Sequence, residues 1–154
     1  MHIDAEQMLA DFFDQLTVEK RASEHTVKSY QRDIKHLTNY CTDKFIHYWT
    51  GLTQSDLRAH IASRHRLGIS STSLQRELSA IRSFYNFLLK KRLADTNPAQ
   101  HVKAPKQARK LPKTLDVDQI NGLLEAGTNS VLEIRDLAMF ELFYSSGLRL
   151  SELA

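Results

Sequence analysis

Apolar residues recur at the spacing of an α-helix in four stretches of the first 95 residues, and this periodicity constrains the fold more than any other feature. Gly and Pro, which break helices, together occupy only eight of the 154 positions. Four amphipathic helices with short connections predict a compact all-α domain, which we place at residues 3–96. The predicted helices are Asp4–Thr17, the stretch from the N-cap Ser23 to Cys41, the stretch from Thr53 to near Leu67, and the stretch from the Ser70–Ser73 cluster to about Lys91.

Segment 97–114 differs in composition from the helical region before it. It contains Pro98, Pro105 and Pro112, and it cannot be helical throughout because proline has no backbone N–H to donate. We predict an extended basic linker. Its composition fits a segment that lies along a phosphate backbone, and equally an exposed hinge that its charges keep soluble. Its cations are Lys103, Lys106, Arg109, Lys110 and Lys113.

Residues 115–154 predict the helical start of a second domain. Asp116 is a suitable N-cap for a short helix that continues to Leu124. The next helix, Val131–Ser145, is apolar on nearly every side, which is typical of a helix buried inside a larger domain. A segment of this length is too short to bury it. We therefore expect a truncated domain, with Ser151 in the first turn of a further helix.

The net charge of +3 is unevenly distributed along the chain. Residues 1–19 hold five acids and no Lys or Arg, a charge of −5, and residues 111–154 hold three Lys or Arg and seven acids, a charge of −4. Residues 20–110 hold 18 Lys or Arg against six acids, a charge of +12. Such a block is typical of a protein that binds a nucleic-acid backbone, and a merely solvated basic surface is the alternative.

Within the basic block, cations and an amide lie on the polar faces of two predicted helices. Lys28, Arg32 and Lys35 follow one another at helical spacing on the second helix. We predict that the Lys and Arg side chains contact phosphates and that Asn86 or an arginine reads a base edge, although a solvated helix face shows the same pattern. The candidate DNA-binding residues are Lys28, Arg32, Lys35, Arg76, Arg82, Asn86, Lys90, Lys106 and Lys110.

Several other classes of protein and site are disfavoured. No apolar run approaches the roughly 20 residues that cross a bilayer, and the acidic N-terminus is unlike a signal peptide, so we expect a cytoplasmic protein. Cys41 is the one cysteine, which excludes an internal disulfide and makes a structural zinc site improbable. His60 and His65 lack metal-ligand spacing on a helix, and we interpret them as surface histidines. A packed local aromatic cluster is expected from Phe45, Tyr48 and Trp49.

The stretch Ser146–Leu153 is the most specific motif in the sequence. Gly147 can adopt a positive φ and end the preceding helix. Arg149 then stands beside the N-terminus of the next helix, where Ser151 is placed to cap and Glu152 to form an ion pair. A guanidinium in this position can bind two phosphate oxygens and stabilise charge that develops on a phosphoryl group. By itself, however, an arginine after a helix-ending glycine is more often a surface residue.

Neighbouring segments add weight to this motif, because together they resemble the bacterial tyrosine recombinases of the phage-integrase family. The resemblance covers essentially the whole chain. In the N-terminal part it rests on Ser23-Glu-His-Thr-Val-Lys-Ser-Tyr30, Arg76-Glu-Leu-Ser-Ala-Ile-Arg-Ser-Phe84 and Asn97-Pro-Ala99. In the C-terminal part it rests on Leu111-Pro-Lys, Asp116-Val-Asp, Asn121-Gly-Leu-Leu, Arg135-Asp-Leu-Ala-Met and Tyr144-Ser-Ser-Gly-Leu-Arg-Leu-Ser-Glu-Leu153.

The resemblance implies a mainly α fold: a four-helix SAM-like core-binding domain at 3–96, a basic linker at 97–114, and at 115–154 the truncated helical start of a mixed α/β catalytic domain. It implies site-specific cutting and rejoining of DNA through a 3′-phosphotyrosine intermediate, without metal or nucleotide cofactors. The implied partners are a double-stranded recombination half-site and a second recombinase of the family in a four-subunit synaptic complex, which resolves chromosome dimers before cell division.

The family pattern identifies Arg149 as the first catalytic arginine, which holds the scissile phosphate. The family's catalytic lysine, its His-x-x-Arg element, its later His or Trp and its nucleophilic tyrosine fall beyond Ala154. We therefore expect a DNA-binding fragment that is inactive alone. The alternatives are a non-enzymatic DNA-binding module or regulator, and a protein-interaction bundle, which the basic block disfavours.

Overall fold

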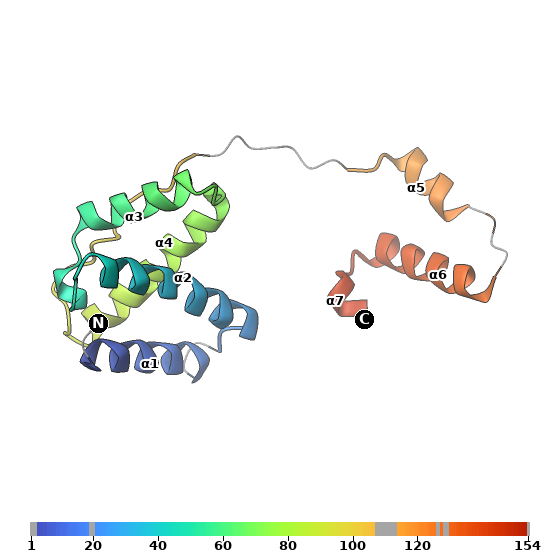
Figure 1. The fold of residues 1–154 in the computed structure, drawn as a ribbon. Helices are drawn as coiled ribbons and strands as arrows, with labels where there is room; N and C mark the ends of the chain where they lie inside the picture. The colour runs from blue at the N-terminus through green and yellow to red at the C-terminus, as the bar shows by residue number, and fades with distance from the viewer. Residues whose placement is uncertain (1–2, 19–20, 107–113, 126, 128–129, 154) are drawn as a thin grey trace. The chain divides into compact units, whose positions relative to one another are not determined.

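The computed structural model describes residues 3–18, 21–106, 114–125, 127 and 130–153. In these residues all regular structure is helical, with seven α-helices, one short 3₁₀ helix and no strand (Figure 1). The chain divides into two compact units, Met1–Ala108 and Arg109–Ala154. The mainly α fold predicted from the helical periodicity is therefore confirmed.

Three of the α-helices of the first unit begin at the Ser or Thr residues that precede a helical pattern in the sequence. Ser23 and Ser70 each accept the backbone N–H of the residue three positions further on. Thr53 and Asp56 form a complete capping box, in which Asp56 accepts the Thr53 backbone N–H at 3.0 Å. These bonds satisfy N–H groups that a first turn leaves unpaired. The elements are α1 (Ile3–Val18), α2 (Glu24–Asp43), η1 (Trp49–Gly51), α3 (Gln54–Arg66) and α4 (Ser71–Lys90).

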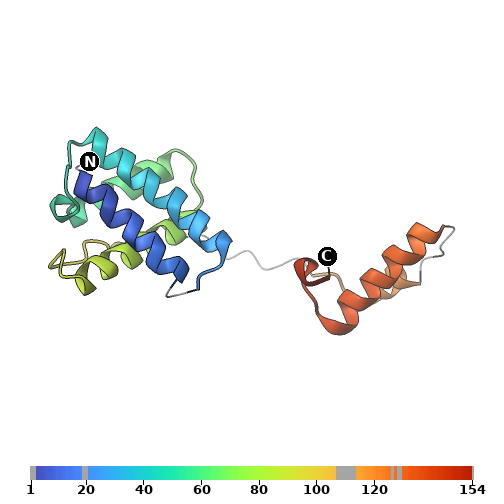
Figure 2. The ribbon, with the colours of Figure 1, turned by 90° about the horizontal axis from the view of Figure 1, so that it is seen from below.

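Helix α4 is the central element of the first unit, because α1, α2 and α3 all pack against it (Figures 1 and 2). Its side chains Leu74, Leu78, Ile81 and Leu88 are at most 1% exposed. They are four, three and seven residues apart and so occupy one side of the helix. Each buried leucine or isoleucine contributes roughly 1.5–3 kcal/mol relative to an exposed one, so this side holds the unit together.

Trp49 connects the core to the first helix. Its indole is 3% exposed, and its Nε1 donates to the backbone carbonyl of Ala5 at 3.0 Å. The Tyr85 hydroxyl donates in turn to the carbonyl of Trp49 at 2.7 Å. The predicted packed cluster of three aromatic residues is wrong, because Phe45 is 81% and Tyr48 is 55% exposed. Only Trp49 belongs to the core, because its large ring fills space between helices distant in sequence.

The segment after α4 differs at its start from the extended linker predicted for 97–114. Ala99 and Val102 are buried, at 0% and 2% exposure, and Arg82 of α4 donates to the backbone carbonyls of both residues. Residues 97–102 therefore pack onto α4 as part of the first unit, because two small apolar side chains and two satisfied carbonyls favour a docked turn over a solvated chain. Positions 107–113 lie outside the described residues.

The second unit contains α5 (Val117–Leu124), α6 (Val131–Ser146) and α7 (Leu150–Leu153). Asp116 caps α5 and Ser130 caps α6, each in a capping box with the side chain three residues on. Gly147 ends α6 in the left-handed conformation, with φ 64°, as the sequence predicts.

Helix α6 presents apolar side chains to solvent on several sides. None of the side chains that the structure describes in the second unit is fully buried. The prediction of a helix apolar on nearly every side holds, and the elements of this unit do not cover it. The most exposed large apolar residues of α6 are Val131, Leu132, Ile134, Phe140, Leu142 and Tyr144. None of the described helices combines the length and apolar character that a membrane span requires.

Candidate nucleic-acid interface

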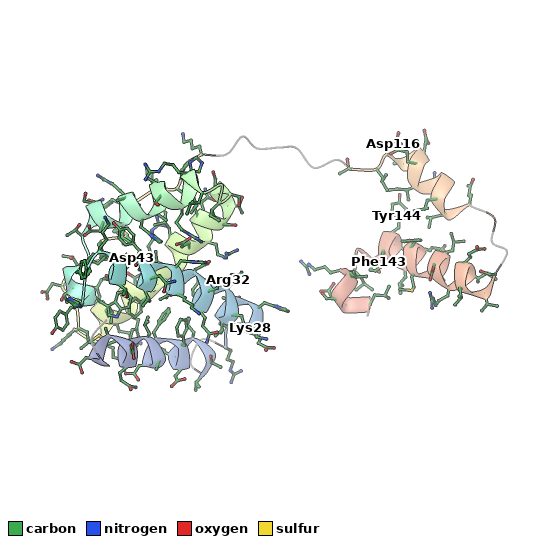
Figure 3. The ribbon with its side chains drawn as sticks, viewed as in Figure 1. Lys28, Arg32, Asp43, Asp116, Phe143 and Tyr144 are labelled. Carbon is green, nitrogen blue, oxygen red and sulfur yellow. The ribbon has the colours of Figure 1, made fainter. Side chains whose placement is uncertain are left out.

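Lys28, Arg32 and Lys35 form an exposed basic stripe on α2, called here the α2 stripe. Figure 3 labels Lys28 and Arg32 of this stripe. The stripe lies opposite the core side of the helix, because Ile34 and Leu37, which are at most 1% exposed, point the other way. Lys28 Nζ pairs with Glu24 Oε1 at 2.5 Å, and both side chains are largely exposed. No acidic side chain of the described residues pairs with Arg32 or Lys35. Their charges are therefore free to bind phosphate oxygens.

Three of the four candidates on α4 are held by contacts within the protein. Arg76 donates to Asp33 of α2, and Arg82 donates to the two carbonyls that dock residues 97–102. Asn86 Oδ1 accepts from Asn97 Nδ2 at 2.9 Å, which leaves its own N–H groups available. Lys90 is exposed near the end of the helix. The structure thus brings the α4 candidates to one polar side but gives most of them a structural partner as well.

A bidentate ion pair between Asp33 and Arg76 joins α2 to α4. The Asp33 carboxylate accepts Nε of Arg76 at 2.8 Å and Nη2 at 2.9 Å. Asp33 is 2% exposed, whereas the Arg76 side chain is 40% exposed. The hydrogen bond to Asp33 raises the pKa of Arg76 above its ordinary value. A guanidinium bound on one edge and open on the other can still donate to a phosphate, in an orientation that its partner fixes.

A second polar group lies buried between α3 and α4. Glu77, 1% exposed, faces His60 Nε2 at 2.6 Å and accepts from Arg64 Nε at 3.2 Å. Burial raises the pKa of Glu77, but the hydrogen bonds and charges of His60 and Arg64 outweigh burial, and the pKa lies below its usual value. The prediction that His60 is a surface histidine is wrong. It is 3% exposed, because its side of α3 faces α4.

Sequence reasoning missed these buried partners, although two of them leave a signal. Asp33 immediately precedes Ile34 on the flank of the apolar side of α2. Glu77 lies three residues after Leu74 and next to Leu78, on the apolar side of α4. A carboxylate at such a position cannot remain buried without a partner, so it predicts an interhelical ion pair or hydrogen bond.

Lys106 is exposed, and Lys103 close by is exposed as well. Both line a groove of about 420 Å³ beside α4. No acidic side chain of the described residues pairs with either lysine. Lys110 lies outside the described residues.

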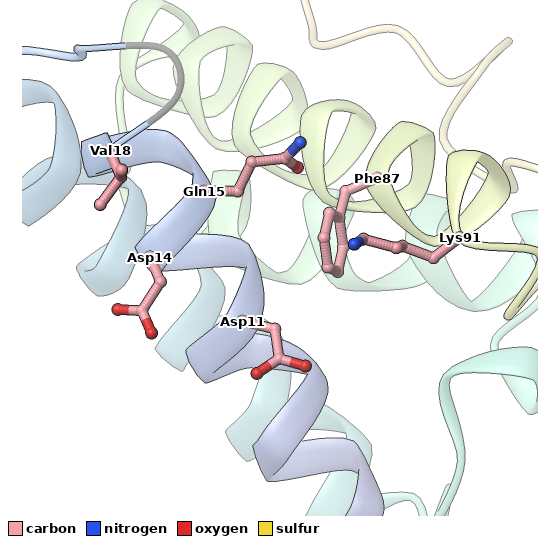
Figure 4. A pocket seen from close by; sticks show the side chains of 6 residues that line it. All are labelled: Asp11, Asp14, Gln15, Val18, Phe87 and Lys91. Carbon is pink, nitrogen blue, oxygen red and sulfur yellow. The ribbon is translucent and has the colours of Figure 1, made fainter.

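Another groove of the first unit, between α1 and α4, has a different character (Figure 4). Asp11 and Asp14 of α1 line it, and Lys91 Nζ lies 6.0 Å from the centre of the Phe87 ring. Two carboxylates disfavour a phosphate there. The acidic groove therefore marks a part of the first unit that is unsuited to a nucleic-acid backbone.

Arg149 stands between the end of α6 and the start of α7. Its side chain is 82% exposed, and its Nη1 donates to Glu152 Oε1 at 3.1 Å, so the ion pair expected with Glu152 is present. The expected cap by Ser151 is not. Glu152 itself accepts the Arg149 backbone N–H at 2.7 Å, and Ser151 lies inside the helix. The turn presents the guanidinium to solvent, where it can bind an anion.

Comparison with known proteins identifies the family. The family model described as "Phage integrase, N-terminal SAM-like domain" matches residues 9–92, more than half of the chain. The chain belongs to the phage integrase family. The tyrosine recombinase XerC of Xylella fastidiosa strain M23 is 44% identical over 147 residues, which cover 96% of this chain and 50% of that protein. XerC of Alcanivorax borkumensis is 44% identical over 149 residues, 96% of this chain and 48% of that protein. XerC of Pseudomonas putida is 44% identical over 149 residues, 96% of this chain and 50% of that protein.

The chain thus spans about half the length of the curated relatives it matches. It carries the N-terminal region of an XerC-like member of the phage integrase family, a family of site-specific recombinases. The matched span contains α2, α4 and every candidate DNA-binding residue on them. Lys106 and Arg149 lie after this span.

Proposed function

We propose that this chain binds the double-stranded DNA of a recombination half-site through α2 and α4. The observation that carries the proposal is the α2 stripe, where Arg32 and Lys35 are exposed and have no acidic partner among the described residues. Arg76, oriented by Asp33, and Lys90 extend the same basic character onto α4. Lys and Arg side chains in such an arrangement neutralise phosphates and release counterions, which supplies most of the affinity for DNA.

We assign residues 3–96 to a core-binding domain and residues 115–154 to the start of a catalytic domain. The whole protein would then cut and rejoin DNA through a 3′-phosphotyrosine, as an XerC-like recombinase in a heterotetramer with an XerD-like partner. Such a recombinase would resolve chromosome dimers in the cytoplasm before cell division. The similarity to proteins named tyrosine recombinase XerC supports this proposal.

Arg149 is the one residue of this sequence that matches the catalytic set implied by the family. An exposed guanidinium at a helix turn is suited to hold the scissile phosphate. Bond cleavage also requires a nucleophile and a proton donor, which an arginine does not provide. We therefore expect the 154-residue chain to bind half-site DNA without cleaving it. Incubation with a nicked suicide substrate tests this, and a covalent protein–DNA adduct would disprove it.

DNA binding is tested by titrating the chain against a half-site duplex and a scrambled duplex over a series of salt concentrations. We expect steep salt dependence and a preference for the half-site. The variant K28Q/R32Q/K35Q should lower the slope of log K against log salt by up to about 2.7, since each lost phosphate contact removes about 0.9.

The matched control removes three charges elsewhere, in the variant K44Q/K91Q/R135Q, and should leave the slope close to that of the wild type. An equal loss of slope in both triple variants would show that only the net charge matters. An unchanged slope in K28Q/R32Q/K35Q would exclude the α2 stripe as the interface.

A further inference from the structure

Hydrogen bonds in both directions join the turn at residues 97–102 to α4: α4 donates to the turn, and the turn donates to α4. Arg82 Nε donates to the carbonyl of Ala99 at 3.0 Å, and Arg82 Nη2 donates to the carbonyl of Val102. Asn97 Nδ2 donates to the carbonyl of Arg82 at 3.2 Å, and Asn97 Oδ1 accepts the backbone N–H of Ala99 at 3.0 Å. With Ala99 and Val102 buried as well, the path of the chain as it leaves α4 is fixed.

This fixed path sets Lys103 and Lys106 beside the polar side of α4. The two lysines line the groove of about 420 Å³ together with Gln75, Ser79 and Arg82. The described residues that line it include no Asp or Glu. The groove therefore gathers three cations and an amide without a competing carboxylate, unlike the acidic groove of Figure 4 on another side of the same helix.

We propose that this groove binds a phosphate of the DNA backbone through Lys103 and Lys106, and that Arg82 is the positioning residue that holds both lysines there. The inference rests on the proposed function, and it assigns to Arg82 a role other than direct DNA contact. Two of the five N–H groups of its guanidinium are used by the docked turn, and in this proposal the contribution of Arg82 to DNA binding passes through the chain that it holds.

The ligand is tested with a fluorescein-labelled DNA duplex of mixed sequence, two helical turns long, because phosphate contacts do not depend on sequence. The variant K103Q/K106Q should lower the salt slope by up to about 1.8 and weaken binding at low salt roughly tenfold or more. The control K44Q/K91Q removes the same charge and should change the slope little. If both double variants lower the salt slope equally, the groove is not a specific phosphate-binding site.

The positioning role is tested with Arg82→Lys, which keeps the charge but cannot donate to two carbonyls in fixed directions. The salt slope of this variant should fall below that of the wild type by nearly as much as the slope of K103Q/K106Q does. The triple variant R82K/K103Q/K106Q should have the same slope as K103Q/K106Q. Trypsin should also cut the free R82K chain faster after Lys103, whereas the K44Q/K91Q control should be cut there as slowly as the wild type.

Other outcomes contradict the proposal in distinct ways. If Arg82 contacts the phosphate directly, R82K will bind like the wild type, and Arg82→Gln will lose slope whether or not the two lysines are present. If Arg82 only stabilises the fold, R82K will unfold at a lower temperature with an unchanged salt slope. If K103Q/K106Q binds normally while K28Q/R32Q/K35Q does not, the groove is wrong and the proposed DNA binding stands. If the wild type does not bind the duplex even at low salt, both are wrong.

Discussion

Asp33 and Arg76 meet across the interface of α2 and α4 in a paired arrangement, with Nε and Nη2 of the arginine 2.8 Å and 2.9 Å from the two carboxylate oxygens. The carboxylate is 2% exposed and the guanidinium side chain is 40% exposed. Loss of one partner therefore affects Asp33 and Arg76 differently. Arg76 can turn to water if Asp33 is lost, whereas Asp33 without Arg76 is a buried charge without its ion-pair partner.

This difference in exposure predicts which of two alanine variants loses more stability. Arg76→Ala should lower the free energy of unfolding by roughly 3–5 kcal/mol, since it leaves the buried carboxylate uncompensated. Asp33→Ala should cost less, about 1–3 kcal/mol. Urea unfolding of both variants and of the double variant measures the coupling between them. A larger loss in Asp33→Ala than in Arg76→Ala would show that the burial of Asp33 does not govern the pair.

Glu77 predicts a loss of stability in acid. Hydrogen bonds and charges of His60 and Arg64 hold its folded pKa below the usual 4.5, despite burial, so the unfolded chain binds the proton more readily. Its stabilising contribution is complete above pH 4.5 and disappears as the pH falls through the folded pKa. His36, whose pKa burial and then Arg64 lower from 6.5, adds an earlier loss below that value.

The measurement is the free energy of urea unfolding between pH 3 and 7, for the wild type and for Glu77→Gln. The variant should be less stable at neutral pH by about 1–3 kcal/mol, because the charged hydrogen bonds are weakened. Below pH 4.5 its curve should be flatter than that of the wild type. Parallel curves over the whole acid range would show that another group controls the acid transition.

Cys41 should be inert in the folded chain. It is 0% exposed, and burial, with a smaller effect of Asp56, raises its pKa to about 11. The reactive thiolate is therefore scarce at pH 8, and reagents reach the sulfur only when the first unit opens. Labelling with a thiol reagent should be slow in buffer and rapid in urea. Rapid stoichiometric labelling of the native chain would mean that α2 separates easily from the core.

The hydroxyl of Tyr85 should contribute measurably to stability. It is buried at 1% exposure and donates to the Trp49 carbonyl at 2.7 Å, so Tyr85→Phe leaves that carbonyl without this hydrogen bond. We expect a loss of about 1–2 kcal/mol in the free energy of unfolding. Tyr30→Phe is the matched control, since Tyr30 is only partly buried and its hydroxyl has no hydrogen bond within the described residues. Equal losses in both variants would contradict the role of the bond.

Local sequence signals predicted the helices well. Ser23, Thr53 and Ser70 each precede a helical apolar pattern, and each is an N-cap in the structure. Gly147 likewise predicted the end of α6, because few residues other than glycine adopt a positive φ at a helix C-terminus. These features depend on neighbours a few residues away, and that information is contained in a single sequence.

Partners distant in sequence were not predictable in the same way. Arg82 and Arg76 carry the pattern of exposed DNA-binding arginines, yet one holds Ala99 and Val102 and the other binds Asp33, 43 residues away. His60 likewise has a partner distant in sequence, because its Nε2 lies 2.6 Å from Oε1 of Glu77 on another helix, and this contact permits its burial. Helical periodicity assigns a residue to a face of its helix, but only the packing of several helices shows which face meets which.

Trp49 is the only tryptophan in the 154 residues, and its buried indole donates a hydrogen bond to the Ala5 carbonyl of α1. Excitation at the red edge of protein absorbance therefore produces emission from the first unit alone. A shift of that emission to longer wavelength would report the release of α1 from the bundle. Loss of secondary structure in the second unit would leave it unchanged, so circular dichroism and tryptophan fluorescence together can follow the two units separately during one melt.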